Sequence, residues 1–150
     1  MARKTRNITS NRKKNVLDSL EGLGIRFCKQ IEAGTFPWVE MKSRSTDNIY
    51  YSPELRQYVL GDKTVRRSSR IVRHLRPFTQ MVWAASFVKD LVVQRKTSTL
   101  RDVYYSAQAF DIFFKDQAES DNIITDLELS LIHISEPTRP RLISYAVFCL

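Results

Sequence analysis

The chain has 150 residues, of which 43% are apolar, and it carries a formal net charge of +8 at neutral pH. This length fits one ordinary domain with extensions, and the apolar share is large enough for a hydrophobic core. Only two cysteines and two histidines occur, without the spacing of metal ligands, which excludes a zinc site, a disulfide framework and a histidine-based catalytic triad.

Basic residues gather in two segments that contain no acid. Residues 1–14 hold six lysines and arginines, and residues 63–76 hold another six. Such blocks favour a polyanionic partner, most simply nucleic acid, through phosphate contacts and counterion release. The alternatives are a solubilising tail for the first block and a solvated helix flank for the second. We expect residues 1–14 to be disordered, because they are polar and strongly charged.

Residues 15–67 are expected to form one helix and several short strands. Apolar residues spaced by three or four positions from Val16 to Ile31 predict a helix that ends near Gly34. Residues 36–41 and 48–51 are predicted to be strands on either side of a polar turn. Residues 58–60 and 63–65 are predicted to pair as a hairpin around the Gly-Asp pair between them.

Residues 68–128 carry the pattern of three helices. A broad apolar face predicts a mostly buried helix that starts at Pro77 and ends near Lys96. A second helix follows Thr99, and a third begins at about residue 116 or 120 and ends at residue 129. Three helices joined by short breaks are typical of a helix-turn-helix, and the whole pattern predicts an α+β, mainly helical fold.

The second of these helices separates two neighbouring tyrosines. Thr99 and Asp102 form a capping-box pattern, which marks a helix start, and capping is the role that we expect for Asp102. Tyr104 belongs to an apolar stripe that is predicted to face the core. Tyr105 points about 100° away from Tyr104 and shares its face with Arg101 and Gln108. We therefore expect Tyr105 to be exposed beside a guanidinium, unless it is only an aromatic at the rim of the core.

Residues 98–106, with the sequence STLRDVYYS, and residues 115–121, KDQAESD, resemble the A subunit of archaeal-type DNA topoisomerase VI. The same family contains the meiotic double-strand-break transesterase. The resemblance covers about residues 15–128, and its specific part is about 98–128. It implies a winged-helix (CAP-like) DNA-binding domain, here preceded by a helix and short β-hairpins. It also implies that Tyr105 is the nucleophile that cleaves DNA and that Arg101 assists it.

The activity implied by this resemblance is that of a type IIB topoisomerase. Tyrosine transesterification gives a 5′-phosphotyrosyl double-strand break, which is then resealed. Two copies of the protein cleave the two strands, in a heterotetramer with an ATPase B subunit that binds ATP. Mg²⁺ is bound by a Toprim domain. Because no Asp-x-Asp pair follows Tyr105, we expect the Toprim domain and its metal site to be absent and the chain alone to be inactive.

The residue types suit this chemistry. A phenol with an ordinary pKa of about 10 is a weak nucleophile at neutral pH, so the tyrosine must be activated and the charge on the phosphate neutralised. The planar guanidinium of Arg101 offers paired donors to phosphate oxygens, and a preorganised donor of this kind typically lowers a barrier by about 3 to 4 kcal/mol. A solvated arginine on the helix flank is the alternative.

The face of Arg101 and Tyr105 is the expected DNA interface. We expect Lys89, Arg95, Lys96 and Gln108 to support it. The third helix is a poor reader of DNA, because residues 115–128 hold five carboxylates against one lysine, and we expect that helix to face protein or solvent. Two other functions stay open. One is a non-enzymatic winged-helix DNA-binding module, and the other is an interaction domain whose basic blocks bind an acidic protein.

The end of the chain differs from the rest. Residues 129–140 resemble translated sequencing-adapter read-through, so we expect residues 129–150 to be foreign to the fold and the wing to be incomplete. The alternative is two strands around a proline-flanked turn that complete the wing. Residues 142–150 are apolar but too few to span a bilayer, and no signal peptide is recognisable. We therefore expect a cytoplasmic protein without a membrane partner.

Overall fold

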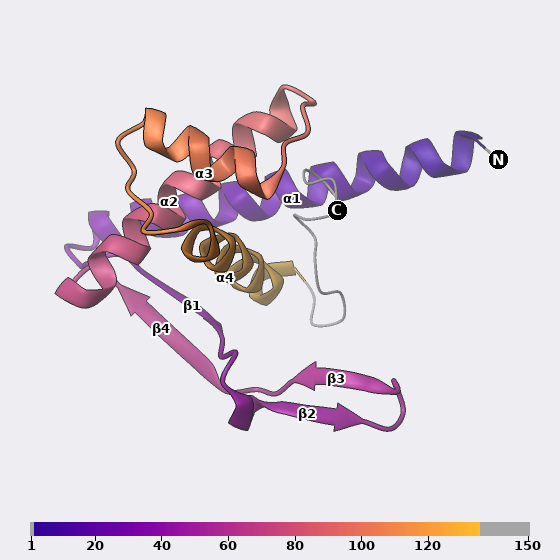
Figure 1. Ribbon diagram of the computed structural model, residues 1–150, viewed down its shortest axis with the longest axis horizontal. Helices are drawn as coiled ribbons and strands as arrows, with labels where there is room; N and C mark the ends of the chain where they lie inside the picture. The colour runs from indigo at the N-terminus through magenta and orange to yellow at the C-terminus, as the bar shows by residue number, and fades with distance from the viewer. Residues whose placement is uncertain (1, 136–150) are drawn as a thin grey trace.

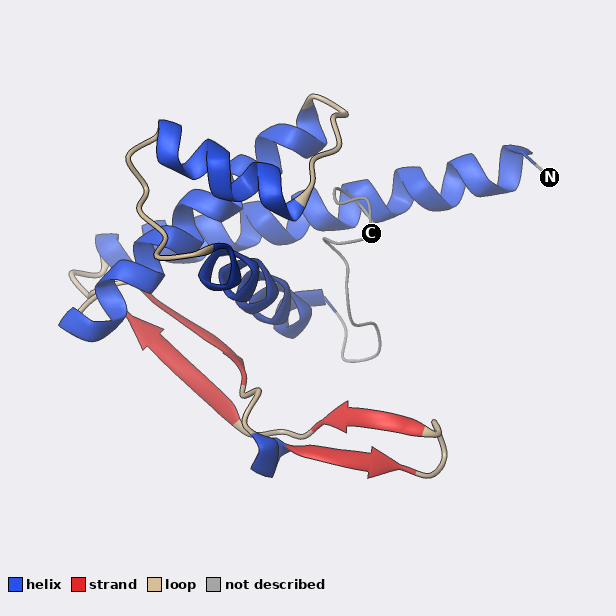
Figure 2. Ribbon diagram, viewed as in Figure 1, coloured by secondary structure: helices blue, strands red, loops and turns tan. Residues whose placement is uncertain are grey.

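The computed structural model describes the backbone of residues 2–135 and the side chains of residues 13–131. Four helices and four strands form an α+β, mainly helical fold, as predicted (Figure 1). Figure 2 shows the helices gathered on one side and two antiparallel ribbons on the other. The elements in chain order are α1 (Ala2–Glu32), β1 (Trp38–Lys42), the short 3₁₀ helix η1 (Thr46–Asn48), β2 (Ile49–Ser52), β3 (Gln57–Leu60), β4 (Thr64–Ser68), α2 (Val72–Val93), α3 (Leu100–Ala109) and α4 (Gln117–Ser135).

Helix α1 begins much earlier than predicted. It starts at Ala2, so the disorder that we expected for residues 1–14 is wrong for residues 2–14. Lysine, arginine and alanine are good helix formers, and neither glycine nor proline occurs before Gly22, so nothing in this segment ends the helix. The predicted end is confirmed: α1 closes at Glu32, and Gly34 follows with a φ of 71°, in the left-handed region that favours glycine.

The predicted hairpin of residues 58–60 and 63–65 is wrong. Strand β3 pairs instead with β2, in a register that places Tyr51 opposite Tyr58, and β4 pairs with β1, with Trp38 opposite Ser68. The two pairs are therefore nested. The chain turns at residues 53–56, and the Gly61-Asp62 segment lies where the outer ribbon β2–β3 joins the inner ribbon β1–β4.

Asn48 holds this junction together. Its side-chain amide donates to the carbonyl oxygens of Ser43 at 2.7 Å and Lys63 at 3.2 Å, and its Oδ1 accepts from the Lys63 backbone N–H at 3.0 Å. The backbone of Gly61 donates to the Asn48 carbonyl oxygen at 2.6 Å. Asn48 is only 4% exposed. A buried amide with its polar atoms satisfied in this way fixes where the outer ribbon leaves the body.

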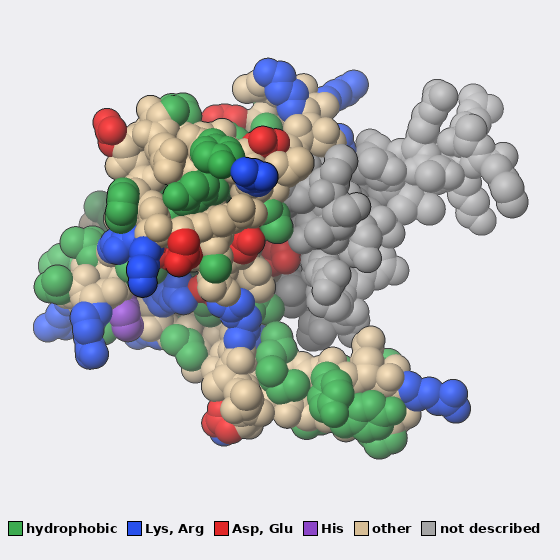
Figure 3. Space-filling view, in the orientation of Figure 1, with side chains coloured by type: hydrophobic (Ala, Val, Ile, Leu, Met, Phe, Trp, Pro, Cys, Tyr) green, Lys and Arg blue, Asp and Glu red, His purple; other side chains and the backbone are tan. Residues whose placement is uncertain are grey.

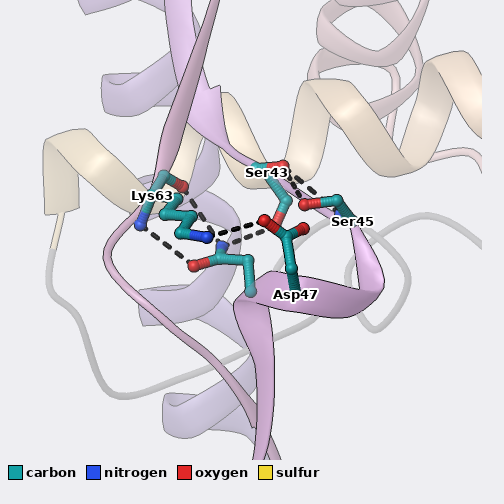
Figure 4. A network of polar contacts seen from close by, with 5 residues as sticks. Ser43, Ser45, Asp47 and Lys63 are labelled. Atoms are coloured by element: carbon teal, nitrogen blue, oxygen red, sulfur yellow. Dashed lines mark hydrogen bonds and ion pairs between the residues drawn. The ribbon is translucent and has the colours of Figure 1, made fainter.

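Charged and hydroxyl side chains surround the same junction (Figure 4). Lys63 Nζ lies 2.6 Å from Asp47 Oδ2, and the hydroxyl oxygens of Ser43 and Ser45 are 3.0 Å apart. The hydrogen bond from Lys63, with a further one from Ser45, lowers the pKa of Asp47 to about 2. Asp47 and Lys63 are exposed, so their ion pair contributes less to stability than the buried Asn48 amide does.

Helix α2 starts at Val72, five residues before the predicted start at Pro77. A proline inside a helix removes one backbone hydrogen bond but need not end the helix. Here the first turn is held by the Ile71 carbonyl oxygen, which accepts from the N–H groups of His74 at 2.8 Å and Leu75 at 3.0 Å. The helix ends at Val93, slightly before the predicted end near Lys96, and Arg95 follows with a φ of 56°.

Helix α4 lies at the centre of the fold, packed against α1, α2, α3 and β1. It continues to Ser135, past the predicted end at Leu129. Leu129 and Leu131 belong to the buried core, so the expectation that residues 129–150 are foreign to the packing is wrong for residues 129–131. The two wing strands considered as the alternative are absent from residues 129–135, which are helical. Residues 136–150 lie outside the described residues.

Candidate DNA-binding and cleavage site

The candidate site is built on α3, a ten-residue helix with a reciprocal cap at its start. The backbone N–H of Asp102 donates to Thr99 Oγ1 at 3.1 Å, and the backbone N–H of Thr99 donates to Asp102 Oδ2 at 3.0 Å. This capping box was predicted and is confirmed. The backbone hydrogen bond from Thr99 lowers the pKa of Asp102, so the carboxylate that caps the helix is charged at neutral pH.

The predicted division of the two tyrosines is also confirmed. Val103 and Ala107 are fully buried, and Tyr104 packs against the core, whereas Tyr105 is 51% exposed. The two rings meet edge to face, with centroids 5.5 Å apart. One face of α3 therefore anchors the helix, and the next carries an accessible phenol.

Arg101 lies beside this phenol. Its Nη2 donates a hydrogen bond to the Tyr105 hydroxyl at 3.3 Å, and its guanidinium carbon is 5.7 Å from the centroid of the Tyr105 ring. The hydrogen bond to Tyr105 raises the pKa of Arg101 above its ordinary value, so the guanidinium is positively charged at any pH near neutral. The exposed pair thus places a phenol oxygen next to a permanent positive charge.

The other predicted DNA contacts are exposed but do not join this pair. Lys89, Arg95, Lys96 and Gln108 are all exposed, and in the described part of the chain no hydrogen bond or ion pair links them to Arg101 or Tyr105. Lys89 lies on α2, and Arg95 and Lys96 lie in the short connection from α2 to α3. Among the described residues no ion pair joins these three cations to an acid, so their charges are open to contact with phosphate.

The second basic block is largely occupied within the protein. Arg67 pairs with Asp126, Arg76 pairs with Glu119 at 2.7 Å, and Lys63 pairs with Asp47. Arg66 lies over the Trp38 ring, 3.7 Å from its centroid. On the face drawn in Figure 3, basic and acidic side chains lie close together rather than in a field of one sign. The block is therefore a weaker argument for a polyanionic partner than its sequence suggests.

The acidic helix α4, which we expected to face protein or solvent, packs against the other helices and β1 of the chain. Asp126 is buried and accepts ion pairs from both Arg67 and Arg44, the second at 3.0 Å. The sequence did not predict the ion pair of Arg44 with Asp126, because the two residues are far apart along the chain and no local pattern joins them. The two ion pairs offset the cost of burying the Asp126 carboxylate.

Among the residues that the structure describes, no three histidine, cysteine, aspartate or glutamate side chains lie where they could hold a metal ion. On α4 the carboxylates of Glu119 and Asp126 pair with arginines instead, and the described residues do not fit the Mg²⁺ that the resemblance implies. Within the same residues, no helix is both long enough and apolar enough to cross a membrane.

Comparisons with known proteins point to one family. Residues 76–134 match the family model described as type IIB DNA topoisomerase. The chain is similar to the A subunit of type 2 DNA topoisomerase 6 from Methanothermobacter thermautotrophicus, with 38% identity over 81% of this chain and 34% of the relative. It is also similar to the A subunits of the same enzyme from Pyrococcus abyssi, with 36% identity over 77% and 32%, and Methanosarcina acetivorans, with 36% over 75% and 31%. The chain thus spans about a third of the length of these relatives. No solved structure matches it.

Proposed function

We propose that this chain, which belongs to the family of type IIB DNA topoisomerase A subunits, carries the tyrosine with which such a protein cleaves DNA. The observation that carries the proposal is the exposed Arg101–Tyr105 pair, with 3.3 Å between Nη2 and the phenol oxygen. The helical face picks out the same tyrosine as the resemblance does.

In the proposed reaction the Tyr105 oxygen attacks a DNA phosphodiester. A bond forms between this oxygen and phosphorus, and the bond from phosphorus to the 3′ oxygen breaks. The phenol loses its proton, and the departing 3′ oxygen gains one. The product is a 5′-phosphotyrosyl link, and attack by the 3′ hydroxyl reverses the step and reseals the strand. Arg101 stabilises the negative charge that develops on the phosphate oxygens.

DNA would approach the exposed face of α3. Lys89, Arg95 and Lys96 provide positive charge for phosphate contacts on the side of the α2–α3 connection, and Gln108 extends the polar surface one turn beyond Tyr105. The short connections between α2, α3 and α4 support a winged-helix (CAP-like) arrangement with double-stranded DNA as the partner.

The remaining properties of the family are proposed for a full-length protein. One is assembly into a heterotetramer that contains a second A subunit and the ATPase B subunit. The others are ATP bound by the ATPase partner and Mg²⁺ bound by a Toprim domain. The described residues do not fit a metal site. For the same reason we expect this chain alone not to cleave DNA.

The test replaces the matching segment of the Methanothermobacter relative with residues 15–128 of this chain, and assays the chimera with its ATPase partner. Covalent DNA adducts should disappear in Tyr105→Phe. The matched control is Tyr104→Phe, which changes the neighbouring, core-facing ring and should leave the adducts largely intact. Adducts that persist in Tyr105→Phe would contradict the assignment and favour a non-enzymatic winged-helix DNA-binding module.

A further inference from the structure

We infer that Thr99 and Asp102 are positioning residues for the Arg101–Tyr105 pair. Their capping box fixes the first turn of α3 and directs the Asp102 carboxylate to the backbone N–H of Thr99. The inference deepens the proposed function and rests on it, since positioning matters only if Arg101 and Tyr105 act on DNA.

The two halves of the pair are held by different interactions. Tyr105 lies between Val103 and Ala107, which are fully buried, so packing of the helix against the core fixes its backbone. Arg101 lies in the first turn, where the apolar anchor is the half-buried Leu100 and the remaining support is the cap. A helix of ten residues frays at an uncapped end. Loss of the cap therefore moves Arg101 relative to a stationary Tyr105.

The cap also decides which group Arg101 contacts. Asp102 is its neighbour in sequence and is exposed, and a free carboxylate there could pair with the guanidinium. In the structure Asp102 Oδ2 instead accepts from the Thr99 N–H at 3.0 Å, and Arg101 donates to the Tyr105 hydroxyl. Among the described residues Arg101 has no ion pair, so its donors stay open to a phosphate.

A rival explanation is that Asp102 acts only through its charge. A carboxylate near DNA repels phosphate, so its removal would tighten DNA binding and change nothing else. Thr99→Ala separates the two explanations, because it breaks the same capping box without changing the charge. Thr99→Ser and Asp102→Glu are the conservative variants, since serine and glutamate also form capping boxes.

The first measurement uses this chain. Nuclear Overhauser contacts between the Arg101 and Tyr105 side chains, and binding to duplex DNA at low salt, are compared across the variants. Thr99→Ala and Asp102→Ala should both abolish the Arg101–Tyr105 contact, but only Asp102→Ala should bind DNA several-fold more tightly. Thr99→Ser and Asp102→Glu should keep the contact. Thr99→Ala with an unchanged contact would overturn the inference.

The second measurement uses the chimera with the Methanothermobacter relative. At saturating DNA, Thr99→Ala and Asp102→Ala should cleave roughly tenfold to a hundredfold more slowly, because small misplacements of reacting groups cost rates of this order. The DNA concentration at half-maximal rate should be unchanged in Thr99→Ala and lower in Asp102→Ala. The conservative variants should restore the rate. Normal cleavage by Thr99→Ala would overturn the positioning role alone, whereas adducts in Tyr105→Phe would overturn the proposed function itself.

Discussion

Arg67 and Asp126 join the inner ribbon to the central helix: Arg67 Nη2 on β4 lies 2.5 Å from Asp126 Oδ2 on α4. The other carboxylate oxygen of Asp126 forms an ion pair with Arg44, which follows β1. One buried carboxylate therefore pairs with two arginines, one on β4 and one just after β1. Arg67 belongs to the basic block that suggested a nucleic-acid partner, but in the structure its charge holds the inner ribbon against α4. The free energy of this attachment can be measured.

Asp126→Asn should lower the free energy of unfolding by about 2 to 3 kcal/mol. The change leaves two guanidinium groups without their acid, and the loss is smaller than for a fully buried pair because Arg44 remains 38% exposed. Urea unfolding measures the effect. The control is Asp62→Asn, since Asp62 is fully exposed in its ion pair with Lys42 and its replacement should leave the stability almost unchanged. Equal effects of the two substitutions would contradict the role given to Asp126.

Gly61→Ala should disturb the junction between the two ribbons. A Cβ at this position would lie 2.5 Å from Asn48 Oδ1, and that oxygen is held by Lys63. We expect a loss of about 1 to 3 kcal/mol, because the clash strains or breaks a buried hydrogen bond. Gly24→Ala is the matched control. Gly24 lies in α1 with nothing near its Cβ position, so alanine should raise stability by about 0.5 to 1 kcal/mol. Thermal unfolding of both variants decides whether the junction is tightly packed.

Duplex DNA binding by this chain should be weak, without sequence preference and strongly salt-dependent. Replacement of Lys89, Arg95 and Lys96 by glutamine should reduce the slope of log affinity against log salt by about one for each phosphate contact that is removed. Arg76→Gln is the control. Arg76 is already paired with Glu119, so its replacement should change the slope little. Binding titrations at several salt concentrations give the slopes. Binding that is indifferent to salt would remove the electrostatic argument for this face.

Leu131→Ala should cost about 2 to 5 kcal/mol, the usual range for a leucine removed from a packed core. Leu131 is 1% exposed, within the segment that the sequence led us to regard as foreign. A chain that ends at residue 128 should lose at least as much. Val93→Ala, at a position that is 60% exposed, provides the control and should have little effect. A stability unchanged by Leu131→Ala would mean that residues 129–131 are foreign to the core after all.

The parts predicted correctly are those that depend on neighbours in the sequence. The start of α3, its capping box and the division into a core-facing Tyr104 and an exposed Tyr105 follow from side chains within one or two helical turns, and the structure has all three. The exposure of Tyr105 and the position of the Arg101 guanidinium beside it could therefore be predicted from the sequence pattern alone. Which face meets DNA is still a prediction.

The parts predicted wrongly depend on contacts between distant residues or on competing preferences. The Gly61-Asp62 pair is a strong local turn signal, but Asn48, thirteen residues earlier, holds this segment in a nested ribbon instead. High charge favoured disorder at the N-terminus, yet a segment without glycine or proline extends α1 to Ala2. The attachment of Arg44 to Asp126 has no sequence signal, because it forms only when the ribbon meets α4.

The buried amide of Asn48 divides one long hairpin into two parts with different tolerance of change. The inner ribbon is tied to α4, whereas the outer ribbon extends away from the helices and turns at exposed residues 53–56 (Figure 1). Exposed loop tips accept insertions most readily. A fluorophore or a short peptide inserted at residues 53–56 should therefore leave the packing of α3 unchanged, which makes the tip of the outer ribbon a suitable place to attach a reporter.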